Sequence, residues 1–132
     1  MSGSRHRRVL RILAALTGFV LLVIGLRFLL VPHQAARFFG IAPGVGSADL
    51  HYVIGARDIW LAGIIIILTV LSDWRGLTIW FGLGIFVCAT DAAIAAHSSG
   101  KVAAVAFHLA SGIFCGALAL ACWRAHVADR VH

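Results

Sequence analysis

Charged residues are scarce in this sequence, and glutamate is missing altogether. Only 12% of its 132 residues are charged, and the five acidic residues are all aspartates. Soluble domains carry about a quarter charged residues, so this scarcity excludes an ordinary soluble domain. A hydrophobic content of 61% and a mean hydropathy of +0.99 point the same way. The composition therefore predicts a protein that resides in a lipid bilayer.

Cysteine is scarce as well, which limits the chemistry that sulfur can provide. Cys88, Cys115 and Cys122 lie singly within apolar stretches, without the CxxC spacing of a redox or metal site. We interpret them as small packing residues.

Four apolar stretches, each of about 20 residues, are predicted to cross the bilayer as helices. They cover approximately residues 9–31, 50–71, 77–97 and 102–123. The short breaks between the later stretches suit tight helical hairpins, and the four helices use nearly the whole chain. The sequence therefore predicts one domain over residues 1–132, an all-α polytopic membrane four-helix bundle. The first stretch is long and ends without a clear cleavage site, so we expect an uncleaved helix, not a signal peptide.

Basic residues are distributed unequally between the two sides of this bundle. One side of four crossings carries Arg5, Arg7, Arg8, Arg11, Arg75, Arg124 and Arg130. The other side carries Arg27, Arg37 and Lys101. The positive-inside rule then places both termini in the cytoplasm, in what we expect to be the cytoplasmic membrane. Lipid headgroups suffice as partners for these residues, and no base-reading element predicts nucleic acid binding.

The longest connection, residues 32–49, differs from the other two. Pro32 is predicted to end the first helix, and His33–Phe39 can form a short amphipathic turn at the membrane interface. Long ordered loops are often functional lids, although a plain connector is an equal alternative.

Charged residues inside the spans are the strongest functional signal. A charge at membrane depth costs at least a few kcal/mol unless it is paired or hydrated. Counting residues from the helix ends places Arg27, Arg57, Asp58, Asp91 and His108 about 6 to 12 Å below the outer surface, at 1.5 Å rise per residue. We therefore predict that residues from all four helices meet in one layer of the outer half of the membrane.

Helical phase predicts which face of each later helix points inward. The inward stripes are His51, Gly55, Asp58 and Ala62; Gly84, Cys88, Asp91 and Ala95; and His108, Ser111, Gly112 and Cys115. Small residues in these stripes let membrane helices approach closely. The run Ile64–Leu68 is predicted to face lipid. Gly112 and Gly116 form a GxxxG pattern, which is compatible with helix packing within the bundle or with a homodimer interface.

Two carboxylates in a low-dielectric pocket acquire different proton affinities when only one is paired closely with arginine. One can then act as base while the other donates a proton. We predict Asp58 and Asp91 as this pair, with Arg57 positioning them. The expected substrate-binding residues are Arg27, His51, Tyr52, His108 and Ser111. Such a set can hydrate or cyclise an epoxide, or isomerise a double bond, in a lipophilic molecule that enters from the bilayer. In residue types alone it resembles the catalytic group of limonene-type epoxide hydrolases, which are soluble and differently folded.

Several alternatives stay open. The charges can be buried ion pairs that only fix helix register, or the chain can be a lipid-binding protein or a structural oligomer. A proton-coupled transporter is a further class, since four helices and this length resemble the small multidrug-resistance exporters. Their signature is a membrane glutamate in the first helix, and this chain has no glutamate.

A metal site is a separate alternative. His51, Asp58, Asp91 and His108 offer imidazole and carboxylate ligands that suit zinc or iron. The spacings HxxxH and ExxH do not occur, and the arginines would repel an ion. We therefore expect no metal and no other cofactor.

The run Gly55-Ala56-Arg57-Asp58, followed by Asp91 in the third stretch, also carries a family resemblance. It resembles a pattern in small four-helix membrane proteins that form a domain-of-unknown-function family, loosely related to the DoxX-like group. The resemblance covers most of the chain. It implies a four-helix bundle and favours small-molecule chemistry, without assigning a reaction.

Overall fold

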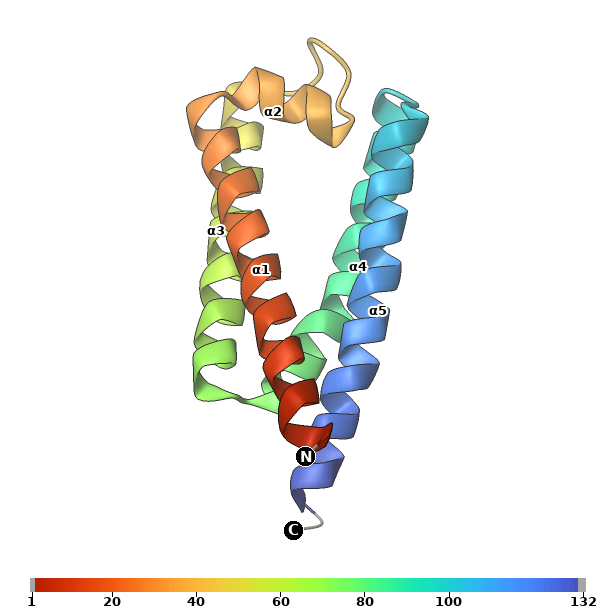
Figure 1. The fold of residues 1–132 in the computed structure, drawn as a ribbon. Coiled ribbons are helices and arrows are strands. Elements are labelled where there is room, and N and C mark those ends of the chain that lie inside the picture. Colours follow the sequence, from red (N-terminus) through yellow and green to blue (C-terminus); the bar gives the residue numbers. More distant parts are fainter. Residues whose placement is uncertain (1, 131–132) are drawn as a thin grey trace.

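The computed structural model describes residues 2–130 and contains five α-helices and no strand within that range. They are α1 (Ser2–Leu30), α2 (Pro32–Phe39), α3 (Ala48–Leu71), α4 (Trp74–Ser98) and α5 (Val102–Arg130) (Figure 1). All except α2 are long and apolar enough to cross a bilayer. The predicted all-α class is confirmed, and the chain is an integral membrane protein with four candidate spans.

Two helices extend further than the apolar pattern predicts. α1 begins at Ser2 instead of near residue 9, and α5 continues to Arg130 instead of ending near residue 123. The apolar pattern marks only the part inside lipid, whereas backbone hydrogen bonding continues into polar surroundings. The extensions bring Arg7 and Asp129 into an ion pair that joins the two ends of the described chain.

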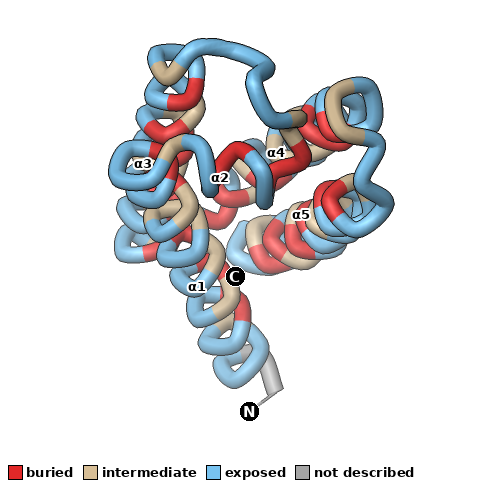
Figure 2. The backbone as a smooth tube through the Cα atoms, turned by 90° about the horizontal axis from the view of Figure 1, so that it is seen from above, coloured by how far each residue is buried: buried red, intermediate tan, exposed pale blue. Residues whose placement is uncertain are grey.

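The four long helices are arranged as two close pairs, α1 with α3 and α4 with α5 (Figures 1 and 2). Glycine permits the first pairing: a Cβ added to Gly25 would lie 2.8 Å from the carbonyl oxygen of Gly55. A Cβ added to Gly55 would in turn lie 2.9 Å from the carbonyl oxygen of Gly25. Between α4 and α5, a Cβ on Gly112 would lie 3.3 Å from the Cβ of Cys88. Gly112, the first glycine of the GxxxG pattern, therefore makes a packing contact within the bundle.

The two helix pairs are joined at the end that holds the termini by an apolar core, here called the terminal cluster. Its buried members are Leu10, Ala14, Ile65, Trp74, Leu77, Phe81, Cys115, Leu118, Cys122 and Ala125. Cys115 and Cys122 are free cysteines and thus act as packing residues in this core. From this end the two pairs diverge toward α2 (Figure 1).

At the other end, α2 runs from the α1–α3 pair toward the α4–α5 pair (Figure 1). Pro32 begins α2, where its missing N–H is no loss. Gly40 ends it with φ 105°, the left-handed conformation that glycine adopts most easily. A Cβ on Gly40 would lie 2.7 Å from the Cβ of Ala95 and 2.9 Å from that of Ala104. The end of α2 therefore packs directly on the α4–α5 pair.

The predicted inward face of α3 is confirmed, because His51, Gly55, Asp58 and Ala62 are all buried. Figure 2 shows buried positions along the sides that the helices turn toward one another. The run Ile64–Leu68 does not face lipid uniformly. Ile67 is 59% exposed, but Ile65 is fully buried in the terminal cluster. A helix that turns by about 100° per residue must direct part of any five-residue run inward.

Candidate functional site

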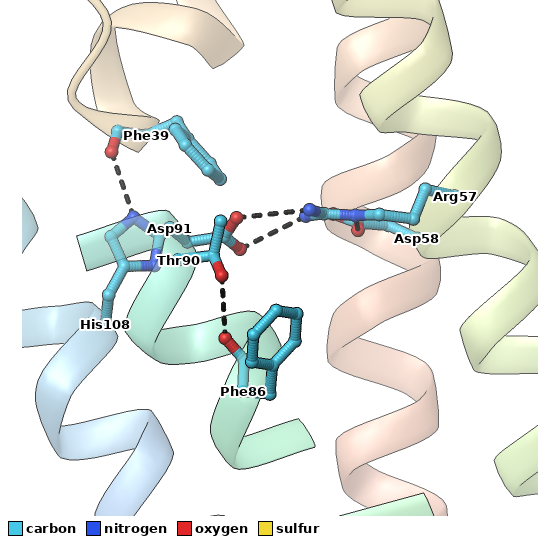
Figure 3. A network of polar contacts seen from close by, with 7 residues as sticks. All are labelled: Phe39, Arg57, Asp58, Phe86, Thr90, Asp91 and His108. Carbon is cyan, nitrogen blue, oxygen red and sulfur yellow. Dashed lines mark hydrogen bonds and ion pairs between the residues drawn. The ribbon is translucent and has the colours of Figure 1, made fainter. Parts of the chain in front are cut away.

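Three charged side chains form a cluster between the two helix pairs, here called the Arg57 cluster: Arg57, Asp58 and Asp91. Nε of Arg57 donates to Oδ1 of Asp58 at 2.9 Å. Nη1 and Nη2 of Arg57 donate to Oδ1 and Oδ2 of Asp91, both at 3.1 Å (Figure 3). One guanidinium group thus binds a carboxylate of its own helix and, in bidentate fashion, a carboxylate of α4.

Burial differs among the three members of the Arg57 cluster. The side chains of Asp58 and Asp91 are 4% and 8% exposed, whereas that of Arg57 is 34% exposed. The acids therefore lie inside the bundle, and the arginine side chain leads from them toward its surface.

The two carboxylates are engaged to different extents. Both oxygens of Asp91 accept from Arg57, and Oδ1 of Asp58 accepts a third hydrogen bond. Within residues 2–130, Oδ2 of Asp58 receives no hydrogen bond. With their usual charges, one arginine faces two aspartates, so a single proton would make the cluster neutral. The arrangement suits proton exchange with a bound molecule.

His108 of α5 lies next to this cluster and links it to α2. It is buried, and its Nε2 is 3.0 Å from the carbonyl oxygen of Phe39, whose ring centroid is 4.6 Å from the imidazole centroid. Figure 3 draws His108 and Phe39 on the opposite side of Asp91 from Arg57. Its immediate role in the structure is to hold the end of α2 against α5.

His51 is buried at a different level from the acids. It precedes Asp58 by seven residues on α3, about 10 Å along the helix axis. Its ring lies 5.9 Å from the ring of His33 and 6.3 Å from that of Phe28, centroid to centroid. The structure therefore places His51 with α2, not in the Arg57 cluster.

Three other predicted substrate-binding residues also lie apart from the cluster. Arg27 is exposed, and its guanidinium carbon lies 4.8 Å from the ring centroid of Phe38. Tyr52 is 42% exposed, because the residue after His51 is turned about 100° away from the buried face. The hydroxyl of Ser111 donates to the carbonyl oxygen of Phe107 at 2.8 Å, one turn back in its own helix.

Two of the pockets among residues 2–130 contain no acid of the Arg57 cluster in their walls. One, of about 170 Å³, lies at the α2 end, and the other, of about 750 Å³, lies beside the basic residues at the terminal end. Among residues 2–130, no three histidine, cysteine or acidic side chains are arranged to hold a metal ion. Within the cluster, the guanidinium of Arg57 takes the place between the carboxylates that a cation would otherwise occupy.

Sequence reasoning missed three residues near the α2 end: Phe39, Arg37 and His33. The carbonyl group of Phe39 is the partner of His108, and no side-chain pattern signals a backbone acceptor. Arg37 and His33 line the pocket at the α2 end together with His51. The available signal was the run of glycines in this connection, Gly40, Gly44 and Gly46, which all adopt positive φ.

Comparison with known protein families gives a match over most of the chain. The family described as a domain of unknown function (DUF4267) matches residues 18–123. The matched range includes α2, α3, α4 and the whole Arg57 cluster. Neither the curated proteins nor the solved structures contain a match.

Proposed function

We propose that this chain, which belongs to the family described as a domain of unknown function (DUF4267), is a membrane-embedded acid–base enzyme. Its substrate would be a lipophilic small molecule, and its reaction the hydrolysis, cyclisation or isomerisation of an epoxide or alkene. The observation that carries the proposal is the unequal engagement of the two buried carboxylates by a single arginine. A looser relationship to the DoxX-like group, based on the Gly-x-Arg-Asp pattern, is part of the same proposal.

The geometry favours distinct roles for the two acids. For a neutral cluster we assign the proton to Asp58, whose Oδ2 accepts no hydrogen bond from the described residues, and the role of base to Asp91, both of whose oxygens accept from Arg57. Asp58 then donates this proton to the epoxide oxygen as the C–O bond breaks. Asp91 accepts the proton of the attacking water, and the two acids exchange protons to restore the starting state. In an isomerisation the same acids would add one proton and remove another.

Access from the side fits both the substrate class and the fold. The acids lie inside four membrane helices, and the partly exposed Arg57 marks a route to them from the bilayer. The lipid-facing surface of the spans is apolar, so a lipophilic molecule is already concentrated where this route begins. Arg57 would hold both carboxylates in place while the substrate oxygen reaches Asp58.

The test is turnover of a panel of lipophilic epoxides by the protein in liposomes, followed by mass spectrometry of the products. Asp58→Asn, checked for folding by circular dichroism, is expected to reduce the rate about a hundredfold or more, because a general acid is lost. Asp49→Asn is the matched control, since Asp49 is exposed in the first turn of the same helix. Wild-type rates in both Asp58→Asn and Asp91→Asn would contradict the assignment.

A transporter is less well supported by the same structure. A solute or proton that crosses the bundle needs polar groups beyond the Arg57 cluster. Toward the terminal end, however, the space between the helices is filled by the apolar terminal cluster. An acid–base enzyme requires no polar route across the whole bundle, and we therefore favour catalysis.

For the orientation, we propose that both termini face the cytoplasm and that the α2 end faces outward. The excess of arginine at the terminal end supports this choice. A fluorescent protein fused to the C-terminus is expected to fold and fluoresce in a bacterial host. A fused alkaline phosphatase that became active instead would reverse the orientation.

A further inference from the structure

A second polar site lies at the α2 end, apart from the Arg57 cluster. It is the cavity of about 170 Å³, here called the α2 cavity. Its walls come from α2, the connection to α3 and the first turn of α3, and include His33, Ala36, Arg37, Ile41, Gly46 and His51. None of these residues makes a hydrogen bond or ion pair with the Arg57 cluster.

His51 is the residue that indicates a ligand. It is only 4% exposed, yet neither of its ring nitrogens has a hydrogen-bond partner among the described residues. Buried polar groups are nearly always hydrogen-bonded, so an orphaned imidazole needs an explanation. Because His51 lines the α2 cavity, a molecule in that cavity can supply the missing partner.

The charge of the lining indicates the sign of that molecule. Arg37 and two histidines line the cavity, and no acidic residue does. Among residues 2–130, Arg37 forms no ion pair, so its guanidinium is available to a ligand. Arginine matches oxyanions such as phosphate with parallel hydrogen bonds. The lining therefore favours an anion.

The amphipathic helix α2 indicates that the α2 cavity lies at the depth of the lipid headgroups. α2 is amphipathic: Ala35, Ala36 and Phe39 are buried, whereas Phe38 is 75% exposed at the end of the spans. A helix of this kind lies in the membrane interface with its aromatic residues dipping into the acyl region. Phosphate groups of lipids lie at the same depth.

We infer that the α2 cavity binds a phosphate group through Arg37 and His51, supplied by an anionic phospholipid or by free phosphate. This inference does not depend on the proposed reaction, since the two sites share no residue. His51 is thereby assigned to phosphate binding, with a ring N–H that donates to a phosphate oxygen.

The experiment follows the His51 imidazole by NMR in protein labelled with ¹⁵N-histidine. His51→Asn assigns the signal, since the other histidine signals persist in that variant. Inorganic phosphate is titrated into protein in neutral detergent, and nanodiscs of phosphatidylglycerol are compared with nanodiscs of phosphatidylcholine. Arg37→Gln is the test variant, because Arg37 is exposed and we expect its replacement to leave the fold intact. Lys101→Gln is the control, an exposed cation at the same end that does not line the cavity.

We expect the His51 signal to shift and saturate, and Arg37→Gln to weaken binding about tenfold or more, with Lys101→Gln unchanged. A shift with inorganic phosphate shows that the free anion suffices, and a shift with phosphatidylglycerol alone assigns the lipid. No shift with either probe, or equal effects of Arg37→Gln and Lys101→Gln, would overturn the inference.

Discussion

Arg57 binds two carboxylates at once because a guanidinium group presents several N–H donors in one plane. Nε faces Asp58, and the two terminal nitrogens face Asp91. A lysine could supply the charge but not the parallel pair of hydrogen bonds. The arginine at position 57 thus determines that Asp91 accepts two hydrogen bonds and Asp58 only one.

A first prediction concerns the stability contributed by each acid. Asp91→Asn should lower the free energy of unfolding by about 3 kcal/mol, because it leaves a half-buried arginine without its bidentate partner. Asp58→Asn should lower it by about 1 kcal/mol, since a single hydrogen bond is weakened. Unfolding in mixed micelles, followed by circular dichroism, measures both. A larger loss for Asp58→Asn would show that the α3–α4 link is not the stronger interaction.

For single residues, the members of the Arg57 cluster could be predicted from the sequence. Depth and helical phase together indicate that Arg57, Asp58 and Asp91 approach one another, and the structure brings them together. Arg27 has a similar depth, but a long side chain near a helix end can reach the interface, where it lies over Phe38. The depth of a residue therefore does not distinguish a side chain that joins the cluster from one that reaches the membrane interface.

Helix pairing depends on close backbone approach at glycine. Gly25 of α1 and Gly55 of α3 face each other so closely that an added Cβ on either would meet the other's carbonyl oxygen. Backbone atoms cannot move aside as flexible side chains can, so the helices themselves would have to separate. The distance between α1 and α3 is therefore sensitive to a single added methyl group.

A second prediction follows for Gly55→Ala. The new methyl group would lie 2.9 Å from the carbonyl oxygen of Gly25, and we expect a loss of about 1 to 3 kcal/mol in unfolding free energy. Gly63→Ala is the matched control in the same helix, where an added Cβ meets nothing within 4 Å. It should be neutral or slightly stabilising. Equal thermal shifts in the two variants would rule out close packing at Gly55.

The four spans were predictable because about 20 apolar residues must appear wherever a helix crosses lipid. Their pairing was not. Gly112 and Gly116 show a recognisable spacing within one helix, whereas Gly25 and Gly55 sit on different helices and share no sequence pattern. A contact made by one glycine from each helix becomes visible only when the helices are placed in space.

The whole molecule consists of two helix pairs joined at both ends. The terminal cluster joins them at one end, and α2 with its following turn joins them at the other, with the Arg57 cluster between. The amide of Ala42 donates to the hydroxyl of Ser98 at 2.9 Å and strengthens the second junction. The distance across the candidate site thus depends on Gly40, which lets α2 meet the α4–α5 pair.

A third prediction compares two glycines with positive φ. Gly40→Ala adds both backbone strain and a clash with Ala95 and Ala104, whereas Gly44→Ala adds strain alone. Hydrogen exchange of the α2 amides should therefore accelerate in Gly40→Ala and change much less in Gly44→Ala. The same exchange rates in both variants would mean that the packing of Gly40 does not hold the second junction closed.

The ion pair between Arg7 and Asp129 has a consequence for the order of the helices along the chain. Because side chains near the two ends of the described chain are in contact, a linker between the ends would close the polypeptide into a ring without displacing any span. The ring could then be opened at the exposed turn near Gly100, giving a circular permutant that begins with α5. Its helices would keep their neighbours although their genetic order had changed.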